Sequence, residues 1–233
     1  MAQTPRHRNR GPSAPPHSPR PTAAPAAGAA ASAAAIARLA TLARTLGLGE
    51  LDPAALPGFE RYLARLLEWN QRINLTAVTD PVEVVRKHFA DCLALVPHVP
   101  HGATLVDLGS GAGFPGAVVA LARPDLEVTL VEPSHKRAAF LRVLVRELPL
   151  PRTVVRAETY EAAVAAVRGR FDAAVSRATW DLPDWLERGR ALVRPGGLVL
   201  GMEGAATHAL PASAERHPVA LPDATRAVIT LRV

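Results

Sequence analysis

A glycine-rich segment is the part of the sequence whose residue types point most directly to chemistry. It reads Val-Asp-Leu-Gly-Ser-Gly-Ala-Gly-Phe-Pro-Gly over residues 106–116, between a predicted strand and a predicted helix. Glycines at 109, 111 and 113 let the backbone turn sharply and let a ligand approach main-chain N–H groups. Glu132 follows at the end of the next predicted strand, where a carboxylate accepts hydrogen bonds from the ribose hydroxyls of an adenosine. The segment predicts a cofactor that contains a nucleoside; the alternative is a glycine-rich turn without a ligand.

Two classes of nucleoside cofactor share this geometry, and other residues distinguish them. In the dinucleotide fingerprint the N-terminus of the helix holds a pyrophosphate. Here Pro115 occupies the first turn of that helix, and Asp107 precedes the loop, where a carboxylate suits a cofactor with a ribose and an amine. The turn Arg-Pro-Gly-Gly over 194–197 is typical of S-adenosylmethionine methyltransferases. These residues favour a methyltransferase over an NAD-dependent oxidoreductase, which stays open as the alternative.

Short apolar runs that alternate with helical stretches position these residues. Predicted strands are residues 103–108, 127–132, 152–156, 171–176 and 197–202, and helical stretches lie around 115–123, 134–147, 159–168 and 181–193. Such alternation is typical of a parallel sheet covered on both faces, and the right-handed crossover rule narrows the topology to a doubly wound, Rossmann-like α/β fold. Segments 218–222 and 227–231 predict two edge strands that end antiparallel to the rest.

The first hundred residues predict a tail and a small helical cap. The start of the chain combines prolines, arginines and alanine runs without periodicity, which predicts disorder. Apolar residues then recur at helical spacing from Ile36, and Asp52-Pro53 and Asp80-Pro81 offer caps and first-turn prolines for two further helices, the second of which reaches Leu95. We expect a disordered tail at 1–31 and one domain at 32–233, divided into a helical cap at 32–100 and a Rossmann-like core at 101–233.

The net charge does not by itself indicate a nucleic-acid partner. The 233 residues contain 27 Lys and Arg against 21 Asp and Glu, a formal net charge of +6. Six arginines precede the first acidic residue, Glu50, so the rest of the chain is formally neutral. A basic surface on the folded part must therefore arise from the arrangement of its side chains. The single cysteine, Cys92, excludes an intrachain disulfide, and no apolar run is long enough for a transmembrane helix. We expect a cytoplasmic protein.

Several separate motifs occur in colinear order between residues 36 and 233. They are Trp-Asn-Gln-Arg-Ile-Asn-Leu-Thr at 69–76, His-Phe-Ala-Asp-Cys at 88–92, the glycine segment, Lys-Arg-Ala-Ala-Phe-Leu at 136–141, Arg-Ala-Glu at 156–158 and Ser-Arg-Ala at 176–178. This pattern resembles the bacterial 16S ribosomal RNA guanine-N7 methyltransferases, the glucose-inhibited division protein B (RsmG) family. The resemblance implies a class I methyltransferase sheet. It also implies transfer of a methyl group from S-adenosyl-L-methionine, without a metal, to N7 of a guanosine in the decoding region of 16S ribosomal RNA.

The resemblance also implies roles for individual residues. By position, Gly109 and Phe114 correspond to cofactor contacts, Glu132 to the ribose acceptor, Ala157 and Glu158 to the pair that meets the adenine, and Arg177 to a catalytic residue that also contacts the cofactor. Judged from the residues alone, an ion pair of Arg177 with Asp172 or Asp181 is the alternative. His88 and Asp91 are spaced like metal ligands, but no third candidate is in register, so we expect a hydrogen-bonded pair or a wall of the RNA-binding face.

One departure from the family pattern affects RNA docking. The family usually has Leu-Lys-Gly after the fifth strand, whereas this chain reads Met202-Glu203-Gly204. If that lysine contacts an RNA phosphate, Glu203 reverses the charge there. Arg226 is a candidate to replace a late Arg-His pair of the family. Glu203 motivates a second alternative, a non-catalytic RNA-binding assembly factor.

Methylation at guanine N7 makes few demands on acid–base residues, because N7 presents a lone pair and loses no proton. We therefore expect the enzyme to act by alignment and electrostatics. No Asn/Asp-Pro-Pro-aromatic run follows the fourth strand, and Cys92 lies far upstream of any position suited to a nucleophile. The candidates for RNA phosphates are Arg72, Arg86, Lys87, Lys136 and Arg137, with Trp180 as a candidate for base stacking. The expected partner is 16S ribosomal RNA or the small ribosomal subunit, without a membrane, and the expected state is a monomer.

Overall fold

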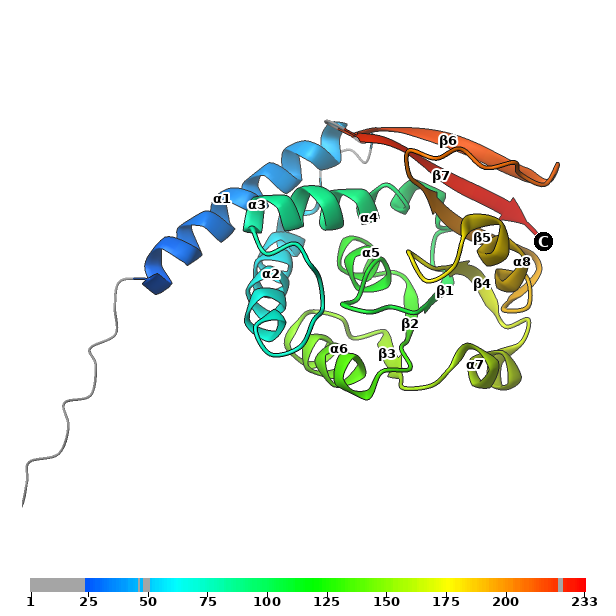
Figure 1. Ribbon diagram of the computed structural model, residues 1–233, viewed down its shortest axis with the longest axis horizontal. Coiled ribbons are helices and arrows are strands. Elements are labelled where there is room, and N and C mark those ends of the chain that lie inside the picture. Colours follow the sequence, from blue (N-terminus) through cyan, green and yellow to red (C-terminus); the bar gives the residue numbers. More distant parts are fainter. Residues whose placement is uncertain (1–23, 46, 48–50, 222–223) are drawn as a thin grey trace, which may run out of the picture.

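The computed structural model describes residues 24–45, 47, 51–221 and 224–233, and the described part is built on one seven-stranded sheet (Figure 1). The strands are β1 (Thr104–Leu108), β2 (Glu127–Val131), β3 (Thr153–Arg156), β4 (Phe171–Val175), β5 (Val193–Glu203), β6 (Ala214–Leu221) and β7 (Ala224–Arg232). Their order is β3-β2-β1-β4-β5-β7-β6. The first five strands are parallel, and β7 is antiparallel to both β5 and β6. The predicted doubly wound α/β fold is confirmed.

One part of the predicted topology is wrong. The sequence predicts two edge strands near the end of the chain, but only β6 lies at an edge, while β7 pairs on both sides. The reason is that β7 is apolar on both faces. Val228 packs into the core on one face of the sheet, and Ile229 and Leu231 pack into the core on the other. A strand buried on both faces suits an interior position in the sheet.

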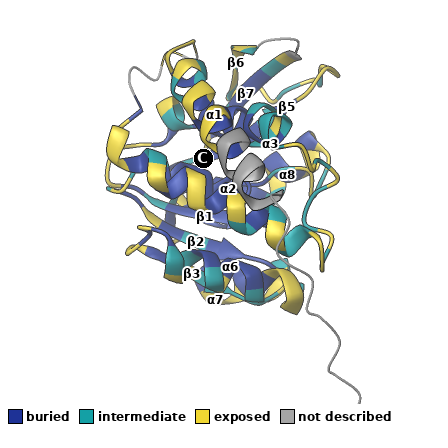
Figure 2. Ribbon diagram, turned by 90° about the vertical axis from the view of Figure 1, so that its left-hand side faces the viewer, coloured by how far each residue is buried: buried dark blue, intermediate teal, exposed yellow. Residues whose placement is uncertain are grey.

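Helices cover both faces of the sheet. Leu105 of β1 belongs to the core shared with α5 (Gly116–Ala122), α6 (His135–Glu147) and the cap. Its neighbour Val106 belongs to the core shared with α7 (Tyr160–Val167) and α8 (Leu182–Gly189). Successive side chains of a strand point to opposite faces, so alternate residues supply the two cores. Figure 2 shows β1 and β2 largely in the colour of buried residues.

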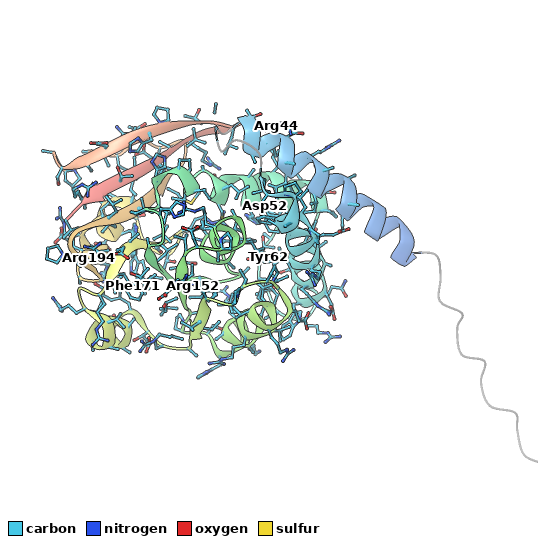
Figure 3. The ribbon with its side chains drawn as sticks, turned by 180° about the vertical axis from the view of Figure 1, so that it is seen from behind. Arg44, Asp52, Tyr62, Arg152, Phe171 and Arg194 are labelled. Atoms are coloured by element: carbon cyan, nitrogen blue, oxygen red, sulfur yellow. The ribbon has the colours of Figure 1, made fainter. Side chains whose placement is uncertain are left out.

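The cap consists of helices packed against α5 and α6. Its elements are α1 (Ala24–Thr45), the 3-10 turn η1 (Pro53–Ala55), α2 (Leu56–Asn70), α3 (Pro81–Val84), the π-helical turn η2 (Val85–Ala90), α4 (Asp91–Leu93) and the 3-10 turn η3 (Val96–His98). Oδ1 of Asp52 accepts a hydrogen bond from Ala54 N (2.8 Å) and Oδ1 of Asp80 from Glu83 N (2.9 Å). Both predicted caps are confirmed; Figure 3 labels Asp52.

The helix α1 begins earlier than the sequence predicts. It starts at Ala24, inside the segment expected to be disordered, because the alanine run favours a helix and Pro25 is tolerated in a first turn. Ile36, Leu39 and Ala43 bury one face of α1 in the cap. Residues 1–23 lie outside the described residues, so disorder there stays a prediction. None of the described helices is long and apolar enough to cross a membrane.

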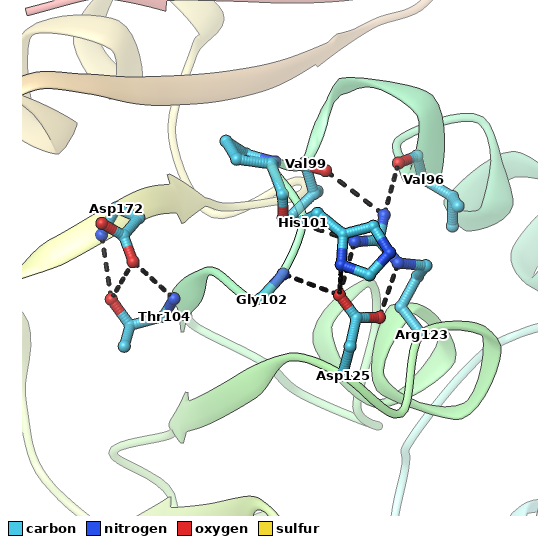
Figure 4. Close-up of polar contacts among 9 residues, drawn as sticks. Val96, Val99, His101, Gly102, Thr104, Arg123, Asp125 and Asp172 are labelled. Carbon is cyan, nitrogen blue, oxygen red and sulfur yellow. Dashed lines mark hydrogen bonds and ion pairs between the residues drawn. The ribbon is translucent and has the colours of Figure 1, made fainter.

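Polar contacts anchor the amino end of β1, opposite the glycine segment (Figure 4). Arg123 donates to both carboxylate oxygens of Asp125 (2.7 Å each) and to the carbonyl of Val99 (3.3 Å). Oδ2 of Asp172 accepts from the N–H and the hydroxyl of Thr104 (2.7 and 2.8 Å). These contacts fix the start of β1 and therefore the position at which the glycine segment leaves its other end.

Candidate active site

The glycine segment leaves β1 where its carboxyl end lies beside those of β2 and β4. Gly109, Gly111 and Gly113 have φ values of +71°, +57° and +94°, which other residues rarely adopt. A Cβ at Gly109 would collide with the hydroxyl of Thr179, and one at Gly113 with the hydroxyl of Tyr62. A Cβ at Gly111 would meet no atom closer than 3.8 Å. Packing therefore demands glycine at two of these positions and leaves open space at the third.

Two buried carboxylates lie against this loop. Oε2 of Glu132 accepts from Gly111 N (2.9 Å), and Oε1 accepts from Ser134 N (2.9 Å). Oδ2 of Asp107 accepts from Gly116 N (2.9 Å), whereas Oδ1 has no partner among the described residues. Burial raises the pKa of Asp107 to about 7. Both side chains thus shape the loop, and Glu132 retains lone pairs for a further donor.

A tyrosine of the cap completes the loop. The hydroxyl of Tyr62, on α2, donates to the carbonyl of Ala112 (2.6 Å), and its ring stacks on Phe114 at 5.8 Å between centroids. Tyr62 is fully buried and is labelled in Figure 3. Sequence reasoning missed Tyr62, because an aromatic residue on the apolar face of a helix looks like an ordinary core residue.

Two cavities meet at this edge of the sheet. The larger, of about 850 Å³, lies between the glycine loop, the cap and the loop after β4, and its lining includes His88, Asp91, Phe114, Arg177 and Arg226. The smaller, of about 360 Å³, is lined by the ends of β1 and β2 and by Glu132, Glu158, Tyr160 and Trp180. Gly109, Arg137 and residues 178–180 line both. Because these residues line both, the two cavities are adjacent.

Arg177 stands at the centre of a charged cluster in the larger cavity. Its guanidinium lies 4.9 Å from the centroid of the Phe114 ring. Nη1 of Arg177 lies 3.4 Å from Oδ2 of Asp91, and Nε of Arg226 lies 3.2 Å from Oδ1 of the same carboxylate. The ion-pair partner of Arg177 is therefore Asp91 of the cap, not Asp172 or Asp181. Asp172 binds Thr104 and Arg194 at the opposite end of the sheet.

His88 is the third neighbour of Arg177. Its Nδ1 lies 3.3 Å from Nη2 of Arg177, and its Nε2 lies 2.7 Å from Oγ1 of Thr76. Burial and the charge of Arg177 lower the pKa of His88 to about 4, so the imidazole is neutral at neutral pH. His88 and Asp91 are thus joined through Arg177. Within the described ranges no group of three or more His, Cys, Asp or Glu is placed to hold a metal ion.

The two residues predicted to meet the adenine differ in position. Glu158 lines the smaller cavity and forms an ion pair with Arg156. Ala157 is half-buried and lines neither cavity. Cys92 is buried, which raises the pKa of its thiol to about 12, so it does not supply a thiolate at neutral pH.

Glu203 lines the larger cavity without presenting a free negative charge there. Its carboxylate accepts from Nε of Arg216 (2.7 Å) and from the backbone N–H of His208 (2.8 Å). The hydrogen bond from Arg216, which outweighs the effect of burial, lowers the pKa of Glu203 to about 2. The charge reversal that the sequence suggests at this position is therefore compensated within the fold.

The predicted RNA-contact residues divide by position. Arg86, Lys87 and Arg137 line the larger cavity, and the first two form ion pairs with Glu83 at 2.8 Å each. Arg72 and Lys136 are exposed outside both cavities. Trp180 lines both cavities and stacks on Trp185 at 5.8 Å between centroids. A partly neutralised basic rim therefore borders the larger cavity.

Comparison with known proteins adds a family to this geometry. The family model described as "GidB: rRNA small subunit methyltransferase G" matches residues 55–221. A protein of Anaeromyxobacter sp. is 42% identical over 167 residues, covering 71% of this chain and 78% of that protein. A protein of Stenotrophomonas maltophilia is 44% identical over 169 residues (72% and 78%), and one of Xanthomonas axonopodis is 42% identical over 190 residues (78% and 88%). All three carry the name ribosomal RNA small subunit methyltransferase G.

Proposed function

The chain belongs to the ribosomal RNA small subunit methyltransferase G family, S-adenosylmethionine-dependent enzymes that methylate N7 of a guanine in 16S ribosomal RNA, and from this membership we propose that its two cavities bind different parts of the cofactor and the substrate. The smaller cavity takes the nucleoside end of the cofactor. The larger takes the methionine end and a guanosine of the decoding region. The observation that supports this division is the shared wall of Gly109, Arg137 and residues 178–180. The family assignment decides against the oxidoreductase that the glycine loop alone leaves open.

The residues present fit the cofactor that the family uses. The open space at Gly111 lets a ligand approach the main chain of the loop, which a side chain there would obstruct. Glu132 lies at the end of β2 and lines the smaller cavity, as a ribose acceptor must. Glu158 borders the same cavity and suits a contact with the adenine amino group. When bound, S-adenosylmethionine supplies an electrophilic methyl group on a sulfonium.

The side chains of the larger cavity align and shield the reacting groups. N7 of guanine has a free lone pair and loses no proton, so the neutral His88 has no proton to remove. Arg177 supplies a positive charge that suits the cofactor carboxylate or an RNA phosphate, and it leaves N7 free. Trp180 offers an aromatic face at the junction of the two cavities. Catalysis by this site is chiefly positioning.

The basic rim supports an RNA substrate. Arg86, Lys87 and Arg137 lie where RNA phosphates would approach the larger cavity. Phosphate contacts of this kind make affinity fall as salt rises. We propose that the enzyme acts as a monomer in the cytoplasm, on 16S ribosomal RNA within or on its way to the small subunit.

Mass spectrometry of 16S ribosomal RNA tests this function. We expect a deletion strain to lack N7-methylguanosine in the decoding region, the wild-type gene to restore it, and Arg177→Ala not to restore it. Full methylation in the deletion strain would reject the assignment. Calorimetry with S-adenosylhomocysteine tests the cofactor site separately, where Glu132→Ala should weaken binding at least about tenfold by removing a buried acceptor. Binding of the cofactor product without any methyl transfer would instead favour an assembly factor.

A further inference from the structure

A chain of hydrogen bonds connects the cap to Arg177. Oδ1 of Asn70 accepts from the backbone N–H of Thr76 (2.9 Å). Oγ1 of Thr76 accepts from Val78 N (3.0 Å) and lies 2.7 Å from Nε2 of His88. Nδ1 of His88 lies 3.3 Å from Nη2 of Arg177. Residues from the end of α2, the following loop, the π-helical turn η2 and the loop after β4 thus meet in one network.

The other contacts of Arg177 do not fix the direction in which its guanidinium points. Asp91 holds it at 3.4 Å and divides its carboxylate between Arg177 and Arg226. The face of Phe114 attracts the guanidinium without fixing its rotation. A third contact, from His88, is therefore needed to set where the remaining N–H groups of Arg177 point.

The neutral imidazole has two tautomers, and only one of them can accept a hydrogen bond from Arg177. Nδ1 of His88 lies 3.1 Å from the carbonyl of Lys87 as well as 3.3 Å from Arg177. A carbonyl only accepts and a guanidinium only donates, so Nδ1 can form a hydrogen bond with only one of them at a time. With the proton on Nε2, Nδ1 accepts from Arg177 and Nε2 donates to Thr76. With the proton on Nδ1, the ring donates to Lys87 and turns an N–H toward a cation. The first arrangement gains a charge-assisted hydrogen bond, which is roughly twice as strong as a neutral one.

We propose that His88 is a positioning residue for Arg177: a neutral imidazole protonated on Nε2, fixed by Thr76, that accepts a hydrogen bond from the guanidinium at Nδ1 and directs it into the larger cavity. The proposal rests on the proposed function, in which Arg177 faces the reacting groups. The charged groups that act on the ring are Arg177 and Lys87, and Asp91 binds the same guanidinium. With its pKa lowered to about 4 by burial and by Arg177, His88 keeps the neutral form that the network requires at neutral pH.

Long-range proton–nitrogen NMR on the full chain with nitrogen-labelled histidine tests the proton position. We expect the His88 ring, assigned by its loss in a His88→Asn spectrum, to show a protonated Nε2 and a bare Nδ1. A protonated Nδ1 would overturn the proposal. This measurement needs no activity and no folded variant beyond the one used for assignment.

Methyl-transfer kinetics with two variants test the role. The amide oxygen of Asn reaches the position of Nδ1, whereas the Gln amide reaches that of Nε2. We expect His88→Asn to keep kcat within about threefold of wild type and His88→Gln to lower kcat at least about tenfold. His101→Gln, at a side chain 88% exposed and outside both cavities, is the matched control and should match wild type.

The outcomes separate the two levels of the proposal. Equal losses in both His88 variants, or a larger loss in His88→Asn, would reject the positioning role while leaving the proposed function intact. An inactive wild-type protein that fails to bind S-adenosylhomocysteine would reject the proposed function itself. Thermal denaturation shows whether either variant is unfolded; in that case the folded variant assigns the His88 ring by the loss of its signal, and the wild-type NMR spectrum decides.

Discussion

At the scale of single residues, Asp107 is a carboxyl group that the fold buries and only half satisfies. Its Oδ2 accepts from Gly116 N, its Oδ1 has no partner among the described residues, and no part of the side chain is exposed. Burial raises its pKa from 3.8 to about 7. The folded chain therefore keeps a proton at this site over a range of pH in which the unfolded chain has released it.

This difference predicts a pH dependence of stability. Between about pH 4 and 7 the folded state binds more protons at Asp107 than the unfolded state, so this group lowers the free energy of unfolding as pH rises, by at most about 1.4 kcal/mol per pH unit. Asp107→Asn removes the effect. Urea unfolding across this range should show that the free energy of unfolding of wild type, minus that of the variant, falls as pH rises. Asp184→Asn, at an exposed pair with Arg188, should run parallel to wild type. A difference that stays constant with pH would contradict the argument.

Individual site residues differ in how far the sequence reveals them. Gly109 and Glu132 carry local signals, because a glycine-rich turn and an acid after the next strand stand in fixed positions relative to two strands. Tyr62 carries none, since its contact with Ala112 spans 50 residues. The partner of Arg177 is similarly remote, as Asp91 lies 86 residues earlier in a different layer. Such contacts depend on tertiary packing and leave no periodic trace in the sequence.

At the scale of elements, the loop between β5 and β6 is held by a buried charge. Glu203, whose side chain is 3% exposed, binds Arg216 of β6 and His208 of the loop. The loop borders the larger cavity through Gly204 and His208. This anchor sets one wall of the site.

Glu203→Lys, which introduces the lysine that the family resemblance implies at this position, should therefore destabilise this chain. It places a cation beside Arg216 and leaves both without a counter-charge, at a cost of about 3–5 kcal/mol. Urea unfolding measures the loss. Glu127→Lys reverses a charge in the exposed pair with Arg152 and should change stability by less than about 1 kcal/mol. Equal changes in the free energy of unfolding for the two substitutions would contradict a stabilising role of the Glu203–Arg216 ion pair.

The elements themselves are largely predictable from the sequence. The predicted strands at 103–108, 127–132, 152–156 and 171–176 match β1 to β4 to within one residue at each end. The fifth differs, because β5 begins at Val193 and includes the Pro-Gly-Gly turn, while α8 ends at Gly189. A Cβ at Gly189 would collide with Val199, so glycine lets the end of this helix pack closely on the sheet. The π-helical turn η2 inside the predicted helix 81–95 is likewise a tertiary feature.

At the scale of the whole molecule, the charge excess and the two cavities lie in different parts of the chain. The six arginines that precede Glu50 account for the whole net charge of +6. The cavities, in contrast, are lined by residues from 75 onward. Within the formally neutral folded body, Arg86, Lys87 and Arg137 gather at the larger cavity.

Deleting residues 1–23 tests how much the arginines of this segment contribute to RNA affinity. The segment carries Arg6, Arg8, Arg10 and Arg20 and no acidic residue. We expect unchanged affinity for S-adenosylhomocysteine and a weaker affinity for RNA at low salt, with a difference that vanishes as salt is raised. Replacing the four arginines by serine in the full chain is the control and should give the same salt dependence. Loss of cofactor binding in the truncated protein would contradict the placement of the domain after the tail.

The position of β7 in the sheet means that the fold is completed late in translation. β7 follows β5 and β6 in the chain but lies between them. During translation β6 emerges before the strand it pairs with, and Asp91 emerges 135 residues before Arg226. The glycine loop and its neighbouring parallel strands can assemble on a nascent chain. Asp91 cannot bind Arg226 until β7 has been synthesised. A translation product that stops within β6 therefore contains the glycine loop but lacks the part of the larger cavity that Arg226 lines.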